Sequence, residues 1–235
     1  MTFIEQIKVI WDLRGLFFES LGFSLLIALF AALMGFVIGV VLVMAKIVPK
    51  TNFVFVILDK LAGFYVTVIR GTPMLVQLLI MYSVVLVSFK FSSTNLIVPI
   101  IAFGINSGAY MAEIIRSGIT SVDVGQMEAG RSLGLSWTTV MFRVIIPQAV
   151  KVVVPAIFNE LISLVKETSV ISVIVLRVND VQKYDLLGYA QRMGLAKPAA
   201  YFAFLFTASL LYLAVVLLLT LVQKIIERRF KKNER

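Results

Sequence analysis

The 235-residue sequence contains no cysteine and no histidine, and only 15% of its residues are charged. Without cysteine the chain forms no disulfide and offers no thiolate nucleophile. Without histidine it lacks the commonest metal ligand and the usual proton shuttle near neutral pH. We therefore expect no metal site. The stretch GINSG at 104–108 superficially resembles a serine-nucleophile turn, but no histidine is available as its base, which excludes a serine hydrolase of the usual kind.

Long uncharged runs are the most prominent feature of the sequence, which is 60% hydrophobic. Three of these runs have 25, 22 and 25 residues, a fourth has 19, and a fifth is interrupted by Glu160, Lys166 and Glu167. A helix of roughly 20 apolar residues crosses a bilayer. The sequence thus predicts an all-α, polytopic membrane protein with five transmembrane helices, near residues 20–45, 73–90, 94–115, 151–176 and 199–223.

The net charge of +9 comes mainly from basic residues beside the apolar runs. Cytoplasmic flanks of membrane helices normally carry such residues, so we expect contact with membrane lipid and not with nucleic acid. Three basic segments, 46–50, 116–143 and 224–235, should then all be cytoplasmic, and an even number of crossings must separate each pair. Five crossings meet this condition and place the amino terminus outside and the carboxyl terminus in the cytoplasm.

The apolar segment 52–70 does not fit as a sixth crossing, because it would move the central basic loop to the outer side. It also carries Asp59 and Lys60 in its middle. We interpret it as a helix lying low in the bilayer or at the cytoplasmic face, with a break near Gly71 and Pro73 before the second span.

The central loop, residues 120–148, is a polar interruption of an otherwise apolar chain. Asp123 can cap one short helix, Gly134 can end it in a left-handed conformation, and Ser136 can cap a second. Pro147 is expected to limit the second helix. That helix places five apolar residues on one face: Trp137, Val140, Met141, Val144 and Ile145.

Small residues in the first short helix, among them Ala129 and Gly130, would let another backbone approach closely. Two interpretations of the loop stay open. It is either a compact knob that sits in a groove of another protein, or a hairpin that lies on lipid headgroups.

Several motifs resemble the permeases of ATP-binding-cassette importers. The "EAA" loop of that family has the pattern E-A-A, three residues, G, nine residues, I-x-L-P. The stretches RGTPMLVQ at 70–77, NSGAYMAEIIRSGI at 106–119, IIPQAVK at 145–151 and NELISLVKETS at 159–169 resemble its polar amino-acid uptake branch. The resemblance covers about residues 20–225, and the residues matching the loop are Glu128, Ala129, Gly130, Gly134, Val144, Ile146 and Pro147. Gly130 replaces an alanine, Val144 an isoleucine and Ile146 a leucine.

The resemblance implies a single transmembrane permease domain, 1–235, in the bacterial cell (inner) membrane. Its partners would be two ATPase subunits, a second permease subunit that is identical or homologous, and an extracytoplasmic amino-acid-binding protein. The chain has no G-x-x-x-x-G-K-[ST] loop, so ATP and Mg would be bound by the separate ATPase and no cofactor by this chain. Glu128 would contact the ATPase, and Gly134 would set the angle between the two short helices.

Polar residues inside the spans are candidates for a substrate pathway. An ionised side chain at mid-bilayer costs at least about 2.5 kcal/mol, so Glu160 should not face lipid. By the resemblance, spans two to four line the pathway. The candidates are Thr72, Gln77, Asn106, Ser107, Tyr110, Asn159, Glu160, Ser163 and Glu167.

Structural alternatives stand beside these roles. Asn106 and Ser107 could be polar packing between helices, and Glu113 with Arg116 could be a salt bridge within one helix. A different function is also open: the chain could be an ion-coupled secondary amino-acid carrier that uses membrane carboxylates. Against this alternative stands the central loop, which a self-sufficient carrier does not need.

Overall fold

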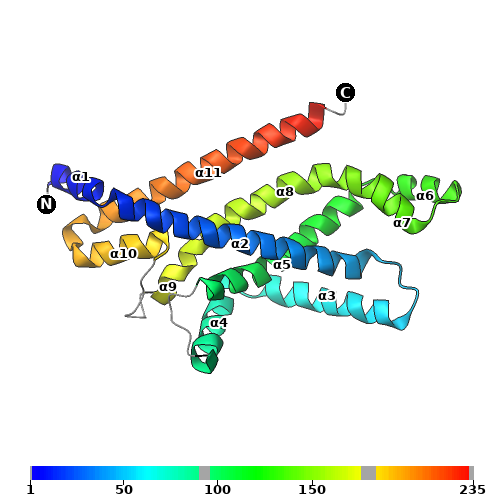
Figure 1. Cartoon of the computed structure of the whole chain (residues 1–235), viewed down its shortest axis with the longest axis horizontal. Helices are drawn as coiled ribbons and strands as arrows, with labels where there is room; N and C mark the ends of the chain where they lie inside the picture. The colour runs from blue at the N-terminus through cyan, green and yellow to red at the C-terminus, as the bar shows by residue number, and fades with distance from the viewer. Residues whose placement is uncertain (1, 90–95, 176–183, 233–235) are drawn as a thin grey trace. The chain divides into compact units, whose positions relative to one another are not determined.

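The computed structural model describes residues 2–89, 96–175 and 184–232 (Figure 1). Within these residues the regular elements are all helices, with no β-strand, which confirms the predicted all-α class. The long helices are α2 (Arg14–Ile47), α3 (Phe53–Gly71), α4 (Met74–Phe89), α5 (Ile97–Thr120), α8 (Ile146–Glu167) and α11 (Tyr201–Lys232). The shorter ones are α1 (Phe3–Asp12), α6 (Val124–Ser132), α7 (Trp137–Val140), α9 (Ser172–Val175) and α10 (Leu186–Ala196). Three further segments are the π-helical η1 (Met141–Ile145) and the 3₁₀-helical η2 (Thr168–Ile171) and η3 (Pro198–Ala200).

The sequence explains where several helices begin and end. At the start of α1, the Thr2 side chain accepts a hydrogen bond from the Glu5 backbone N–H, and the Glu5 carboxylate accepts one from the Thr2 N–H, which is a capping box. The predicted break after residue 70 is confirmed, because α3 ends at Gly71 and α4 begins at Met74. Pro73 fits just before the first turn of α4, where its missing N–H has no helical partner to lose.

In the described part of the chain, four helical stretches are long and apolar enough to cross a membrane: Arg14–Ile47, Ile97–Thr120, Trp137–Ile174 and Pro198–Phe230. These correspond to four of the five predicted spans. The remaining one, 73–90, corresponds to α4, whose apolar stretch Met74–Val84 is shorter. Residues 90, 94 and 176, at the edges of predicted spans, lie outside the described residues.

The chain divides into two compact units, each built from several separate stretches. Unit 1 comprises Met1–Leu33, Thr72–Gly104 and Leu161–Leu219. Its larger core is centred on Ile27, Leu78, Phe103 and Leu164. A second core in the same unit contains Phe17, Leu186, Tyr189 and Phe204, where the Phe17 and Tyr189 rings meet edge to face at 5.0 Å.

Unit 2 comprises Met34–Gly71, Ile105–Glu160 and Thr220–Arg235. Its core between α2, α3 and α5 contains Val43, Val66, Ala109 and Ala112. A further cluster under the central loop is formed by Val140, Met141 and Ile145.

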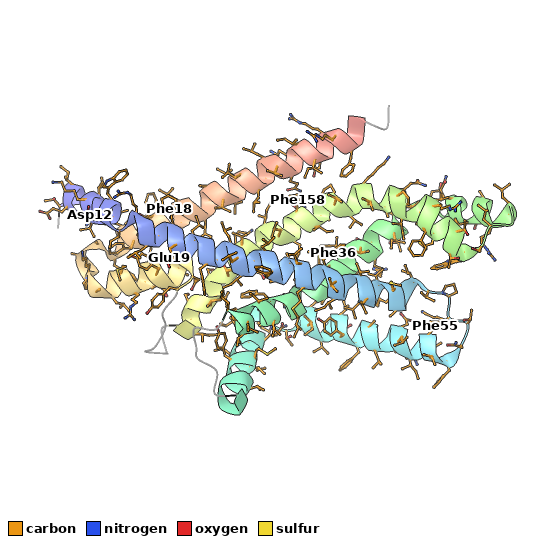
Figure 2. All side chains as sticks on the ribbon, in the orientation of Figure 1. Asp12, Phe18, Glu19, Phe36, Phe55 and Phe158 are labelled. Atoms are coloured by element: carbon orange, nitrogen blue, oxygen red, sulfur yellow. The ribbon has the colours of Figure 1, made fainter. Side chains whose placement is uncertain are left out.

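Apolar side chains stay exposed along the long helices. On α2, Phe18 is 59% exposed and Phe36 is 42% exposed, and both project from the ribbon (Figure 2). On α11, leucines at 210, 213, 217, 218 and 221 are each about half exposed. Soluble monomers rarely expose apolar surface on this scale, whereas lipid solvates it.

Candidate functional site

The central loop has the caps and the turn that the sequence predicts. Asp123 precedes α6, and its Oδ1 accepts a hydrogen bond of 2.8 Å from the Gly125 N–H. Ser136 precedes α7, and its Oγ accepts a hydrogen bond of 3.1 Å from the Thr139 N–H. Between them, Gly134 has a φ of 81°, the left-handed conformation that glycine adopts without steric cost. The loop is thus two short helices joined at Gly134.

Gly130 lets α6 approach α7 within the loop. A Cβ placed on Gly130 would lie 2.6 Å from the Val140 Cγ2, so no larger residue fits without movement. Val140, Met141 and Ile145 are buried there, with Trp137 and Val144 partly buried beside them, which confirms the predicted apolar face of the second helix. Packing between α6 and α7 within this chain therefore explains why residue 130 is small.

The opposite side of the central loop is exposed. Glu128 and Ala129 are both exposed. Leu133, which follows α6, is 82% exposed. Phe142 is also 63% exposed, but it lines an apolar pocket that includes Phe36 of α2 and Ile115 of α5. Buried apolar contacts stabilise the loop, and its surface presents charged and large apolar side chains. Protein interfaces commonly combine such side chains.

The predicted end of the second helix at Pro147 is wrong. The chain stays helical through η1 into α8, and Pro147 is the second residue of α8. A proline removes one backbone donor and crowds the carbonyl four residues earlier, and the wider turn of a π-helix accommodates both effects. The Gln148 side-chain amide donates a hydrogen bond of 3.0 Å to the Val144 carbonyl in the turn that contains Pro147. Ile146, the other matched residue at this end, is half-buried.

In unit 2, the structure brings Ser107 of α5 and Glu160 of α8 together. The Ser107 Oγ donates to the Glu160 Oε1 at 2.8 Å. Ser107 and Asn106 are both buried. Ser107 fits because α2 has a glycine opposite it: a Cβ on Gly35 would lie 2.8 Å from the Ser107 Oγ. One turn later Gly39 meets α5 equally closely, so the GFVIG stretch at 35–39 is a close helix contact of the small-xxx-small kind.

A second polar contact in unit 2 joins α8 to α11 and was missed from the sequence. The Gln223 side-chain amide donates to the Asn159 Oδ1 at 3.0 Å and to the Pro155 carbonyl at 3.2 Å. Gln223 is only 8% exposed. The available signal was an amide at the end of an apolar run, four residues before Glu227.

Tyr110, the remaining candidate in unit 2, lies against a charged side chain of α3. The Arg70 guanidinium lies 5.3 Å from the centre of the Tyr110 ring, within the range of a cation–π contact. The Arg116 and Glu113 side chains form an ion pair within α5. The interpretation of Glu113 and Arg116 as a salt bridge within one helix is therefore confirmed.

Four candidates belong to unit 1. The Gln77 side-chain amide donates to the Thr72 Oγ1 at 2.8 Å and to the Thr72 carbonyl at 3.2 Å, across the break before α4. Ser163 and Glu167 are half-buried on α8. Five of the nine candidates are thus hydrogen-bonded. Thr72 bonds Gln77 in unit 1, and in unit 2 Ser107 bonds Glu160 and Asn159 bonds Gln223, which was not a candidate.

Asp185, which the sequence did not single out, is the most deeply buried carboxylate of unit 1. It is 0% exposed and caps α10, where its Oδ2 accepts from the Leu187 N–H at 3.1 Å and the Gly188 N–H at 3.3 Å. Its Oδ1 has no hydrogen-bond partner. Burial raises the pKa of this carboxyl to about 7, against the lowering effect of the two backbone N–H groups.

The described residues include no group of three or more carboxylates that could hold a metal ion. The site is therefore a set of polar contacts between apolar helices, together with an exposed two-helix loop. This combination is typical of a helical membrane protein.

Comparison with known proteins identifies the family. The family described as "Binding-protein-dependent transport system inner membrane component" matches residues 35–232, and the chain belongs to it. The predicted location, a multi-pass protein of the bacterial inner membrane, is confirmed by this membership together with the apolar helices.

Relatives span nearly the whole chain. The arginine transport system permease protein ArtQ of Bacillus subtilis is 37% identical over 216 residues, which cover 92% of this chain and 93% of the relative. The putative glutamine transport system permease protein GlnP of Rickettsia typhi is 35% identical and covers 88% of each chain. The chain is also similar to a crystal structure of an amino acid ABC transporter, with a TM-score of 0.83 and 33% identity over 97% of this chain and 99% of that one. An inward-facing MetNI methionine ABC transporter has a TM-score of 0.71 at 18% identity, covers 98% of this chain and 99% of that one, and shows the fold alone.

Proposed function

We propose that this chain is the transmembrane permease subunit of an ATP-binding-cassette importer for polar amino acids. The observation that carries the proposal is the central loop, whose two helices pack on each other and leave Glu128, Ala129 and Leu133 exposed. Such a surface suits docking on a separate ATPase subunit, where Glu128, Ala129 and Gly134 would take part. The names of relatives that span about nine tenths of the chain support amino acids as the substrate.

The topology we propose has five crossings, with the amino terminus outside and the carboxyl terminus in the cytoplasm. The whole chain, 1–235, forms one permease domain, and the central loop 120–148 faces the cytoplasm as the coupling loop. Support comes from the basic residues on that loop, including Arg131 and Arg143, and at the carboxyl end of α11. A cytoplasmic position is required if an ATPase is to reach the loop.

The complex we propose contains two ATPase subunits that bind ATP and Mg, a second permease subunit, and an extracytoplasmic amino-acid-binding protein. Motion of the ATPases would tilt the loop helices, and α8 would carry the movement because α7, η1 and α8 form one continuous helical stretch from Trp137. The substrate pathway would include the three polar contacts described above, together with Tyr110, Ser163 and Glu167.

A zwitterionic amino acid needs an anion for its ammonium group and hydrogen-bond donors for its carboxylate. Within unit 2, Glu160 would supply an anion for the ammonium group, and the side-chain amide of Asn106 would supply a donor for the carboxylate. Both sets come from residues that the sequence places in spans two to four.

The test is reconstitution. The tagged chain is purified with the subunits that accompany it, placed in liposomes with ATP in contact with the ATPase, and supplied with binding protein and labelled arginine or glutamine. We expect uptake that requires ATP and the ATPase subunit. Uptake by the chain alone, driven by a sodium or proton gradient, would establish the ion-coupled carrier and overturn the proposal.

A further inference from the structure

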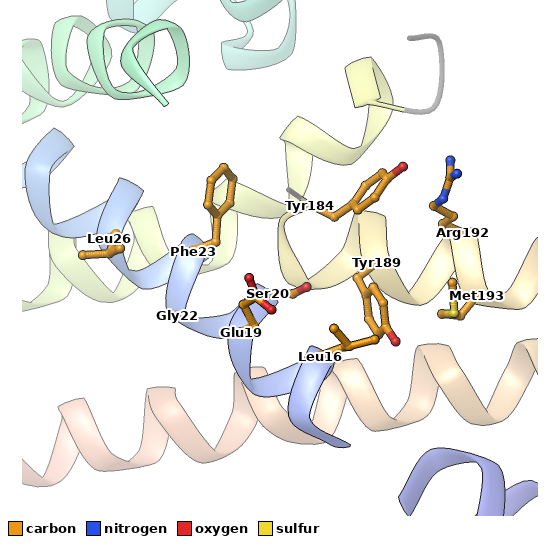
Figure 3. Close-up of a pocket in the computed structure, with 10 residues that line it drawn as sticks. All are labelled: Leu16, Glu19, Ser20, Gly22, Phe23, Leu26, Tyr184, Tyr189, Arg192 and Met193. Atoms are coloured by element: carbon orange, nitrogen blue, oxygen red, sulfur yellow. The ribbon is translucent and has the colours of Figure 1, made fainter. Parts of the chain in front are cut away.

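Two pockets of the described chain are lined mainly by apolar and aromatic side chains. The pocket in unit 1 has a volume of about 370 Å³, and Phe23 and Met193 lie on its walls (Figure 3). The pocket in unit 2 has a volume of about 770 Å³ and includes Phe36. Neither pocket is lined by a candidate of the proposed pathway. Among the candidates on α8, Asn159 is the exposed one.

The side-chain nitrogen of Gln223 on α11 faces three oxygen atoms. It lies 3.0 Å from the Asn159 Oδ1, 3.2 Å from the Pro155 carbonyl oxygen and 3.4 Å from the Glu227 Oε1. A backbone carbonyl and a carboxylate accept hydrogen bonds and do not donate them. An amide oxygen in place of this nitrogen would face both acceptors with no hydrogen between them. These partners therefore fix the end of the Gln223 amide that points at α8, which is the nitrogen.

The hydrogen bond from Gln223 in turn fixes the orientation of Asn159. An asparagine amide has an oxygen that accepts and a nitrogen that donates two hydrogen bonds. Because the Asn159 oxygen accepts from Gln223, the Asn159 nitrogen points away from Gln223. Gln223 is 8% exposed, whereas Asn159 is exposed. In the part of the chain that the structure describes, the Asn159 side chain forms no other hydrogen bond, so its nitrogen stays available as a donor.

This available donor lies within a predicted membrane span. Asn159 directly precedes Glu160 in α8, inside the span 151–176. An N–H group without an acceptor is costly in lipid, so the Asn159 nitrogen should face water, a solute or another protein chain. In a zwitterionic amino acid the carboxylate is the charged acceptor, and hydrogen bonds to charged acceptors are stronger than those to neutral ones.

We propose that Gln223 is a positioning residue for amino-acid recognition, because it directs the nitrogen of Asn159, and not its oxygen, toward the carboxylate of the solute. The inference rests on the proposed function, which makes the solute an amino acid. Asn159 donates to the solute, and Gln223 acts through Asn159 without contacting the solute itself. A reversed Asn159 amide would present its oxygen, which repels a carboxylate.

Two variants remove or reverse the donor while they preserve side-chain size. Asn159→Asp keeps an oxygen for the Gln223 N–H and replaces the exposed nitrogen by a second oxygen, so folding should not change. Gln223→Glu combined with Glu227→Gln exchanges the two side chains at constant net charge. The carboxylate at position 223 then needs donors, so the Asn159 amide should turn its nitrogen toward it. Glu227→Gln alone is the matched control, because an amide oxygen at 227 still accepts from Gln223.

The measurement is equilibrium binding to the purified complex in nanodiscs, without ATP or binding protein. The ligands are labelled arginine and glutamine, together with their decarboxylated amines, agmatine and 4-aminobutyramide. We expect the wild type and Glu227→Gln to bind one of the amino acids about tenfold more tightly than its amine, which lacks the carboxylate. Asn159→Asp and the exchange of residues 223 and 227 should each lower the affinity for the amino acid by about that factor, and should not lower the affinity for the amine.

A structural role would give different results. Affinities for the amino acid and its amine that fall together, or a lower yield of paired permease subunits at unchanged affinity, would overturn the inference. A wild type that binds neither amino acid would also overturn it. The proposed function is judged separately by ATP-dependent uptake, so normal uptake with unchanged discrimination in both variants would overturn the positioning role of Gln223 alone.

Discussion

The Asp185 carboxyl is fully buried at the start of α10, and its pKa is raised to about 7 from an ordinary 3.8. Between these two values the folded chain holds a proton that the unfolded chain has lost, so stability from this group falls as pH rises through the window. Asparagine caps a helix as well as aspartate and cannot ionise. We therefore expect Asp185→Asn to raise stability at pH 8, by on the order of 1 kcal/mol or more, and to change it little at pH 4.

The measurement is the Tm of the purified complex at pH 4 to 8 in detergent, followed by intrinsic fluorescence. Asp123→Asn, the same substitution at the exposed cap of α6, is the matched control. A Tm for Asp185→Asn that runs parallel to the wild type at every pH would contradict the role assigned to this buried carboxyl.

Glu160 is the pathway candidate with the strongest contact, the hydrogen bond from Ser107. Glu160→Ala should reduce uptake about tenfold or change the preferred amino acid, because it removes the anion proposed for the ammonium group. The yield of assembled complex should change less than twofold. Glu113→Ala, which breaks an ion pair within one helix, is the control and should leave uptake nearly unchanged. An unchanged substrate profile in Glu160→Ala would leave the carboxylate with a structural role only.

Local chemistry made some residues predictable and others not. The caps at Asp123 and Ser136 and the left-handed Gly134 follow from preferences of single residues, so the sequence was sufficient. Gln223 was missed because it bonds Asn159, 64 positions away. Asp185 was missed because the start of α10 is anchored by a distant contact, the hydrogen bond from the Leu186 N–H to the Ser24 Oγ, 162 positions away. No local pattern marks such contacts.

At the scale of the element, the crossing of α2 and α5 in unit 2 depends on glycine. A Cβ on Gly39 would lie 2.6 Å from the Met111 Cβ and 2.9 Å from the Ala112 backbone nitrogen. Backbone cannot move aside as a flexible side chain can, so Gly39→Ala should destabilise the chain by about 1 to 3 kcal/mol. That corresponds to a fall in Tm of several degrees.

Gly63→Ala on α3 is the matched control for this prediction. A Cβ there meets nothing within 4 Å, and alanine favours a helix by up to about 1 kcal/mol, so Tm should hold or rise. The two substitutions are therefore expected to have opposite signs. If both raise the Tm of the complex in the same assay, α2 and α5 do not pack as closely as described.

The prediction of helix boundaries succeeded after α3 and failed at Pro147. The break between α3 and α4 was predicted from Gly71 and Pro73. Pro147 looked like a second break, yet the chain stays helical there because η1 widens the turn before it. The π-helical segment contains Met141 and Ile145, which are buried against residues outside the segment, and the local sequence does not reveal those contacts.

At the scale of the whole molecule, apolar runs were enough to predict an all-helical membrane protein and four of its long helices. Hydropathy predicts these helices because backbone N–H and C=O groups in lipid must hydrogen-bond to each other, and an α-helix satisfies them within one segment. The same rule says nothing of which spans meet, so the division of α2, α5, α8 and α11 between two units was not foreseen. The number of crossings and the sidedness of the termini stay predictions, and labelling of single cysteines introduced at residues 2 and 232 of this cysteine-free chain would test the termini.

The coupling of ATP hydrolysis to uptake is a property of the complex, and Gly134 offers a direct probe of it. The residue has a φ of 81° and open space around it, so an aspartate fits at a backbone cost of about 1 to 2 kcal/mol. Its carboxylate would stand between the exposed Leu133 and Leu135, on the surface proposed to meet the ATPase. We expect Gly134→Asp to insert normally and to hydrolyse ATP, while uptake per ATP falls at least about tenfold. Gly134→Asn, which tolerates the same backbone conformation without charge, should retain most of the uptake. Normal uptake by Gly134→Asp in proteoliposomes would mean that the central loop does not transmit the motion of the ATPase.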